Sequence, residues 1–122
     1  MAAVAGILTE VLTDQGIVAT DRLAAVLHIT KTELARATGL SRDAVSKRSR
    51  LGSRQTQTQL RDTVEIINRV SGWTGSVGRA FAWFRSQPLP SFGDKTAEDL
   101  VKEGRAEAVK TYLSRISEGG YA

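Results

Sequence analysis

The apolar residues of this 122-residue chain recur at the three- and four-residue spacings of amphipathic helices. The first stripe predicts a helix over residues 2–12 that ends at Gly16. Later stripes predict further helices. Four of them are expected to be capped at their N-termini, by Thr20 or Asp21, by Thr30 or Thr32, by Ser41 and by Thr96. Three more are expected to start near Leu60, Ser76 and Ala106. Residues 51–58 are polar and are expected to form a loop or a frayed helix end, and Ser71 and Gly72 are expected to stop the helix before them. No segment alternates as a strand does, so we expect an all-α fold.

Residues 32–48 have the form of a helix-turn-helix. Ala35 is the small residue required where the first helix faces the second, and Gly39 follows four positions later, where the turn needs a positive φ. Val45 is the buried aliphatic residue expected six positions further on. This spacing predicts a DNA-binding unit whose second helix lies in the major groove.

The second helix of this motif is expected to present its polar residues to DNA. The predicted outward-facing residues are Ser41, Arg42, Asp43, Ser46 and Lys47, and the predicted contacts to the phosphate backbone are Arg48, Arg50 and Arg54. Arg48 stands where another core aliphatic is usual, and we expect Leu51 to replace it. The alternative is a helical hairpin that has kept this fold without binding DNA.

Charge is segregated along the chain. The net charge is +4, but Lys31–Arg61 contains eight basic and two acidic residues, a net charge of +6, which leaves −2 for the rest. This segregation indicates a polyanionic partner for the middle segment, the alternative being a solvated charged surface.

Several functional classes are excluded by residue content. Cysteine is absent and His28 is the single histidine, so we expect no metal site and no cofactor. The acidic pairs Glu98/Asp99 and Glu103/Glu107 have no histidine, cysteine or glycine-rich loop to join them, so we expect no catalytic residues and no enzyme. No apolar run spans a membrane and no signal peptide is evident, which favours a cytoplasmic protein.

The C-terminal third carries a set of short motifs in a fixed order. They are Ala82-Trp83-Phe84, the proline turn Pro88–Gly93, Thr96–Leu100, Gly104, Val109 with Leu113, and the ending Glu118–Ala122. In order and spacing these pieces resemble the Xre/MbcA/ParS family of antitoxins. With the upstream motif, the resemblance covers about residues 21–122. Ala97 departs from the family, which commonly has proline there, but either residue suits a first helical turn.

The resemblance implies a homodimeric antitoxin that neutralises a cognate RES-domain toxin, an NAD-consuming or ADP-ribosylating protein, by obstructing its active-site cleft. It also implies binding to operator DNA and repression of the antitoxin's own operon. We expect Phe81 and Trp83 in the core, and Phe92, in the proline turn, as a partner contact. The predicted toxin contacts are Phe92, Lys102, Arg105, Gly119, Gly120, Tyr121 and Ala122. For Tyr121 the alternative is a frayed terminus.

The expected organisation is an N-terminal arm at residues 1–20, a helix-turn-helix domain at 21–70 and a toxin-binding domain at 71–122. The alternative function is a helix-turn-helix transcriptional regulator whose C-terminal helices only dimerise it.

Overall fold

The computed structural model describes residues 2–117, apart from the side chains of residues 2–5, 48 and 49. In chain order the helices are α1 (Ala2–Val11), α2 (Thr20–Leu27), α3 (Lys31–Thr38), α4 (Arg42–Ser46), α5 (Arg48–Leu51), α6 (Arg54–Thr74), α7 (Val77–Ser86), the 3-10 helix η1 (Pro90–Phe92), α8 (Ala97–Lys102) and α9 (Ala106–Ser117). Within the described residues the extended pairing is limited to isolated bridges, Leu12 with Val18 and Leu89 with Lys95. The all-α prediction is therefore confirmed. Over the same residues no helix is both long and apolar enough to cross a membrane.

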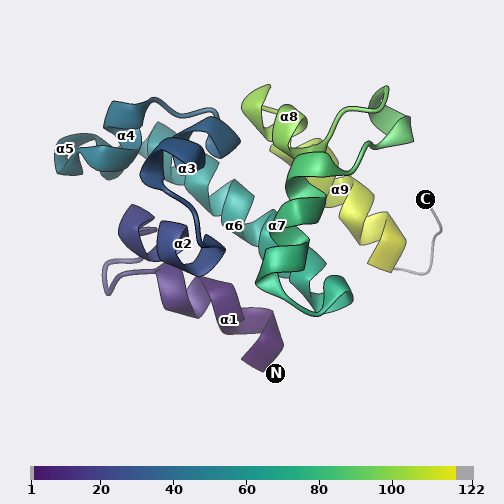
Figure 1. Cartoon of the computed structure of the whole chain (residues 1–122), viewed down its shortest axis with the longest axis horizontal. Coiled ribbons are helices and arrows are strands. Elements are labelled where there is room, and N and C mark those ends of the chain that lie inside the picture. Colours follow the sequence, from purple (N-terminus) through teal and green to yellow (C-terminus); the bar gives the residue numbers. More distant parts are fainter. Residues whose placement is uncertain (1, 118–122) are drawn as a thin grey trace.

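Helix α6 is the central element of the molecule. Figure 1 shows it running behind the other helices through the middle, with α1–α5 towards one side and α7–α9 towards the other. It packs on α1, α3, α5, α7, α8 and α9. The predicted stripe of Leu60, Val64, Ile67 and Val70 is fully buried along it, and one continuous apolar core joins both sides. The helices that carry the predicted DNA contacts and those that carry the predicted toxin contacts therefore share one core.

The predicted limits of the α6 helix were wrong at both ends. The polar stretch is helical from Arg54, because Ser53 caps the helix by accepting a 3.2 Å hydrogen bond from the backbone amide of Thr56. The helix also continues through Ser71 and Gly72 to Thr74, and Gly75 ends it in a left-handed conformation with φ 91°. A glycine inside a helix costs only about 1 kcal/mol, which the packing around buried Val70 offsets.

Two predictions about the N-terminal helices also need correction. Helix α1 ends at Val11, before Gly16, which instead occupies the tight turn between the bridged Leu12 and Val18 with φ 77°. Thr20 is the first residue of α2 and does not cap it. Its hydroxyl donates instead to the carbonyl of Val45 at 2.8 Å, which ties α2 to α4.

The caps predicted for three other helices are confirmed. Thr30 forms a reciprocal capping box with Glu33 at α3. Ser41 accepts from the Ala44 amide at 3.1 Å to cap α4, and Thr96 forms a box with Asp99 at α8. Because these caps fix where α3, α4 and α8 begin, they position the residues discussed below.

Two glutamines near the start of α6, Gln57 from the expected loop and Gln59 just after it, connect different parts of the chain. Gln57 accepts from the Val18 amide at 2.8 Å and donates to the Leu51 carbonyl at 2.8 Å. The Nε2 group of Gln59 donates to the Thr38 carbonyl at 2.7 Å and to the Val101 carbonyl at 2.8 Å. Gln59 thus joins the C-terminal ends of α3 and α8, one on each side of α6.

Candidate functional site

Helices α3 and α4 meet at a tight turn whose geometry follows from Gly39. This glycine has φ 75°, a conformation that L side chains rarely adopt. A Cβ atom added to it would lie 3.0 Å from Cγ of Lys102, so the turn also packs closely against α8. Ala35 and Val45 are buried at 6% and 1% exposure, as their positions predicted.

The helix expected over residues 41–48 is not continuous. Helix α4 ends at Ser46, Lys47 is extended with φ −96° and ψ 126°, and α5 begins at Arg48. Leu51, in α5 after the interruption, is half-buried and packs against the apolar core, a role for which a charged arginine is unsuited. The expectation that Leu51 replaces Arg48 in the core is confirmed, while the single long helix was wrong.

The predicted DNA contacts lie on one short segment and are accessible. The exposed residues are Ser41, Arg42, Asp43, Ser46, Lys47, Arg50 and Arg54, and the side chain of Arg48 lies outside the described residues. Arg42 donates to Ser46 at 3.3 Å, and the Lys47 ammonium is 3.7 Å from Asp43. These contacts lie within α4 and its C-terminal end.

The aromatic cluster of the C-terminal helices divides into core and surface members. Phe81 and Phe84 are buried with ring centroids 6.3 Å apart, and Trp83 packs half-buried against the core. Phe92 in η1 lies edge-on to Tyr112 of α9, with centroids 5.9 Å apart. The Arg105 guanidinium carbon is 5.5 Å from the Phe92 ring centre. The structure thus brings together two predicted toxin contacts, Phe92 and Arg105.

Lys102, a third predicted contact, takes part in a partly buried ion-pair cluster. Glu98 has only 10% of its side chain exposed and lies 2.8 Å from Lys102 Nζ and 3.0 Å from Arg85 Nε. Arg85 also lies over the Phe81 ring at 5.5 Å. Glu98 therefore connects α7 with α8 through charge-assisted contacts.

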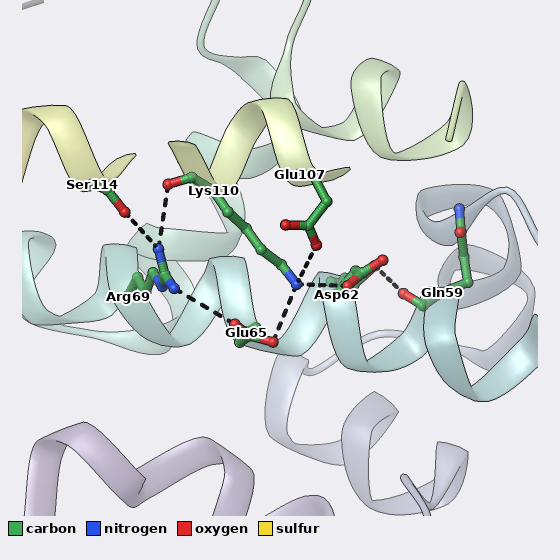
Figure 2. Close-up of polar contacts among 8 residues, drawn as sticks. Gln59, Asp62, Glu65, Arg69, Glu107, Lys110 and Ser114 are labelled. Atoms are coloured by element: carbon green, nitrogen blue, oxygen red, sulfur yellow. Dashed lines mark hydrogen bonds and ion pairs between the residues drawn. The ribbon is translucent and has the colours of Figure 1, made fainter. Parts of the chain in front are cut away.

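Helix α9 is fastened to α6 by a polar network that the sequence reading missed. Figure 2 shows the Lys110 ammonium between carboxylates of both helices, 2.7 Å from Asp62, 3.2 Å from Glu65 and 3.3 Å from Glu107. Next to it, Arg69 donates to the Lys110 carbonyl at 3.3 Å. Burial alone would lower the pKa of Lys110, but its hydrogen bonds and charge interactions with Asp62 and Glu65 outweigh this and raise the pKa above its ordinary value of 10.5.

An apolar groove lies between the C-terminal parts of α6 and α9. Among the residues that the structure describes, Trp73 is the one exposed large hydrophobic side chain, at 46% exposure. It lines a hollow of about 390 Å³ together with Arg69 of α6 and Leu113, Ser114 and Ser117 of α9. Sequence reasoning grouped Trp73 with the other aromatics, although its place near the predicted end of a helix was a signal of exposure. The groove extends to Ser117, beyond which the predicted contacts Gly119, Gly120, Tyr121 and Ala122 lie outside the described residues.

No three histidine, cysteine, aspartate or glutamate side chains within the described residues are placed so that they could hold a metal ion.

Comparison with known families found one match. Residues 73–119 match the family model described as the antitoxin Xre/MbcA/ParS C-terminal toxin-binding domain. The matched segment contains Trp73, Phe92 and Arg105, and it runs from the end of α6 through α9. The match supports an antitoxin role and implies a toxin as partner. Comparison with curated proteins and with solved structures found no significant match.

Proposed function

We propose that this protein is an antitoxin that neutralises a cognate RES-domain toxin through its C-terminal helices and binds operator DNA through α3 and α4. The observation that carries the proposal is the match of residues 73–119 to a toxin-binding domain. In detail, we propose that the antitoxin obstructs the toxin's active-site cleft and that it represses its own operon as a homodimer.

The Trp73 groove supports a toxin contact within the matched segment. Tryptophan is among the residues that contribute most to protein interfaces when a partner buries it. Here Trp73 is 46% exposed beside a hollow of about 390 Å³, and three of the other lining residues, Leu113, Ser114 and Ser117, belong to α9. We assign the groove to the toxin because these residues lie inside the segment that matches the toxin-binding domain.

Phe92 and Arg105 are the second part of the proposed toxin surface. Both side chains are positioned by neighbouring groups. Phe92 contacts the Tyr112 ring, and Arg105 contacts the Phe92 ring and lies 3.8 Å from Glu103. Side chains ordered before binding lose less conformational entropy in a complex. Arg105 would therefore meet a carboxylate or nucleotide-binding cleft with its orientation already set.

The N-terminal surface supports DNA binding by charge and exposure. Arg42, Arg50 and Arg54 are exposed and form no ion pair with an acidic side chain of the described residues. They lie in the segment whose net charge is +6. A dimer would place two such segments on the two halves of a two-fold operator.

The alternative is a transcriptional regulator whose C-terminal helices only dimerise it. The exposed Trp73 is the observation in its favour, because an apolar groove with an adjacent indole also suits a second copy of the same surface.

The two functions are separated by whether the neighbouring reading frame encodes a RES-domain protein and whether that protein co-purifies with this chain. Trp73→Ala should weaken the toxin complex about 30-fold, the effect of losing about 2 kcal/mol at an interface centre. Thr9→Ala, at an exposed position of α1, is the matched control and should bind normally. If Trp73→Ala leaves toxin affinity intact but converts a dimer to a monomer in light scattering, the regulator is the better description.

A further inference from the structure

Helix α8, which lies inside the segment that matches the toxin-binding domain, packs directly on the turn between α3 and α4. The point of contact is Gly39, whose φ of 75° sets the turn. A Cβ atom added to this glycine would lie 3.0 Å from Cγ and 3.4 Å from Cα of Lys102, so the backbone of α8 itself approaches the turn. The turn that orients the predicted reading helix is therefore in contact with the C-terminal half of the chain.

Gln59 of α6 holds this contact together with two hydrogen bonds. Its Nε2 group donates to the Thr38 carbonyl at 2.7 Å and to the Val101 carbonyl at 2.8 Å. Thr38 directly precedes Gly39, and Val101 directly precedes Lys102. Both acceptor residues are fully buried, so water is poorly placed to replace these bonds if the glutamine is lost. Gln59 thus fixes the turn and the end of α8 at the same point.

The Lys102 side chain is in turn held by Glu98. Its ammonium lies 2.8 Å from Glu98, whose side chain is 10% exposed and also lies 3.0 Å from Arg85 of α7. With the ammonium bound at Glu98, the aliphatic stem of Lys102 packs against Gly39. Sequence analysis predicted Lys102 as a toxin contact, but these interactions suit it to a role at the turn.

Helix α4 depends on the turn for its orientation because it is short. It has five residues, of which Ala44 and Val45 are buried. A hydrogen bond to a base edge needs a donor–acceptor distance of about 3 Å and a nearly linear angle, so a small rotation of α4 would break it. Contacts to phosphates carry no sequence information. A displaced turn would therefore lower the preference for one DNA sequence more than the general affinity for DNA.

We propose that Gln59 and Lys102 are positioning residues for DNA reading, which hold the α3–α4 turn from the side of the C-terminal helices. The proposal rests on the proposed DNA binding and deepens it. Neither residue is among the predicted DNA contacts. Gln59 acts through the Thr38 carbonyl and Lys102 through Gly39, so α8 forms part of the DNA-reading unit although it lies in the toxin-binding segment.

Two variants of Lys102 isolate its contact with the turn. Lys102→Met and Lys102→Ala both remove the charge, but only Lys102→Met keeps the stem against Gly39. Gln59→Met removes both hydrogen bonds at a similar side-chain length, and Gln87→Met, at an exposed position at the end of α7, is its matched control. Circular dichroism melting shows which variants fold. Because the Lys102 side chain is 33% exposed, both of its variants should fold, and this pair decides the outcome if Gln59→Met does not.

The measured quantity is the ratio of two DNA affinities, obtained by fluorescence anisotropy in one buffer. One duplex carries the region upstream of the protein's own reading frame, and the other carries a shuffled sequence of the same length and composition. Lys102→Ala and Gln59→Met should lower this ratio about tenfold, the effect of losing one base contact, at unchanged affinity for the shuffled duplex. Lys102→Met and Gln87→Met should keep the ratio of the wild-type protein.

The ratio distinguishes positioning from a loss of folded protein, which lowers both affinities in proportion. Such a proportional loss, or an unchanged ratio in Lys102→Ala and in Gln59→Met, would overturn the positioning role and leave the DNA function standing. An equal drop in Lys102→Met and Lys102→Ala would overturn the contact assigned to the stem, because the lost charge alone would explain it. A ratio near one for the wild-type protein would instead refute the proposed DNA reading itself.

Discussion

Lys110 is predicted to be the main polar anchor of α9, and Lys110→Met tests this. Methionine keeps the length and packing of the side chain but removes the charge that reaches Asp62 and Glu65. The Lys110 side chain is 13% exposed and that of Asp62 18%, so the variant leaves a largely buried carboxylate without its cation. Breaking a fully buried pair costs about 3–5 kcal/mol and an exposed one less than about 1 kcal/mol. For this intermediate burial we expect about 2 kcal/mol.

The assay is thermal and urea unfolding at neutral pH. A loss of about 2 kcal/mol should lower the melting temperature by about 8 °C in a chain of this size. Glu107→Gln is the matched control, because the Glu107 side chain is 85% exposed and its contact with Lys110 should contribute less than about 0.5 kcal/mol. A Lys110→Met variant as stable as Glu107→Gln would refute the anchoring role.

The same network predicts a dependence on pH. Because the pKa of Lys110 is raised in the folded chain, its ion pairs stabilise the fold fully below the ordinary lysine value of 10.5. That stabilisation is lost as the pH rises through the raised value. The stability difference between wild type and Lys110→Met should therefore be constant near neutrality and shrink above pH 10.5. A difference that persists unchanged at higher pH would show that packing, and not charge, fastens α9.

Three further predictions concern the two surfaces and the turn between them. Arg42→Ala and Lys47→Ala should each weaken operator binding by about 1–3 kcal/mol where they read bases, and unchanged gel-shift affinities in both would exclude α4 as the reading element. Gly39→Ala should cost more than about 1 kcal/mol in urea unfolding, because its φ of 75° is strained for alanine and the new methyl would lie 3.0 Å from Lys102 Cγ. Deleting residues 119–122 should leave the melting temperature unchanged but reduce protection in a co-expression growth assay, and full protection by the folded truncation would exclude the tail as the part that obstructs the toxin.

The features that could be predicted from the sequence are those set by local spacing. The buried stripe from Leu60 to Val70 follows from its period, and the caps at Thr30, Ser41 and Thr96 follow from side chains that reach amides three residues away. These interactions are encoded within a few residues, so a single sequence contains all the information needed. The break at Lys47 is different, since it depends on how Leu51 reaches the core.

The features that could not be predicted depend on partners far away in the chain. The role of Gln59 becomes apparent only once its two acceptors are known, and these lie 21 and 42 residues away. Lys110 of α9 contacts Asp62 of α6, which lies 48 residues earlier in the chain. The charges along each helix do not show that these two helix faces pack together.

The shared core decides how the two proposed functions must be tested. Helix α6 packs on α1 on one side and on α7 and α9 on the other, and Gln59 is bonded to the ends of both α3 and α8. Cutting the chain after α6 would expose the apolar side of this helix and leave Gln59 without the Val101 carbonyl, so a truncated DNA-binding half would be destabilised by the cut itself. Single substitutions at exposed positions avoid this. Arg42→Ala should weaken DNA binding and leave toxin binding intact, and Trp73→Ala should do the reverse, with both variants melting like wild type. If either substitution impaired both activities in a stably folded protein, the two surfaces would have to be coupled through α6 and the α3–α8 contact.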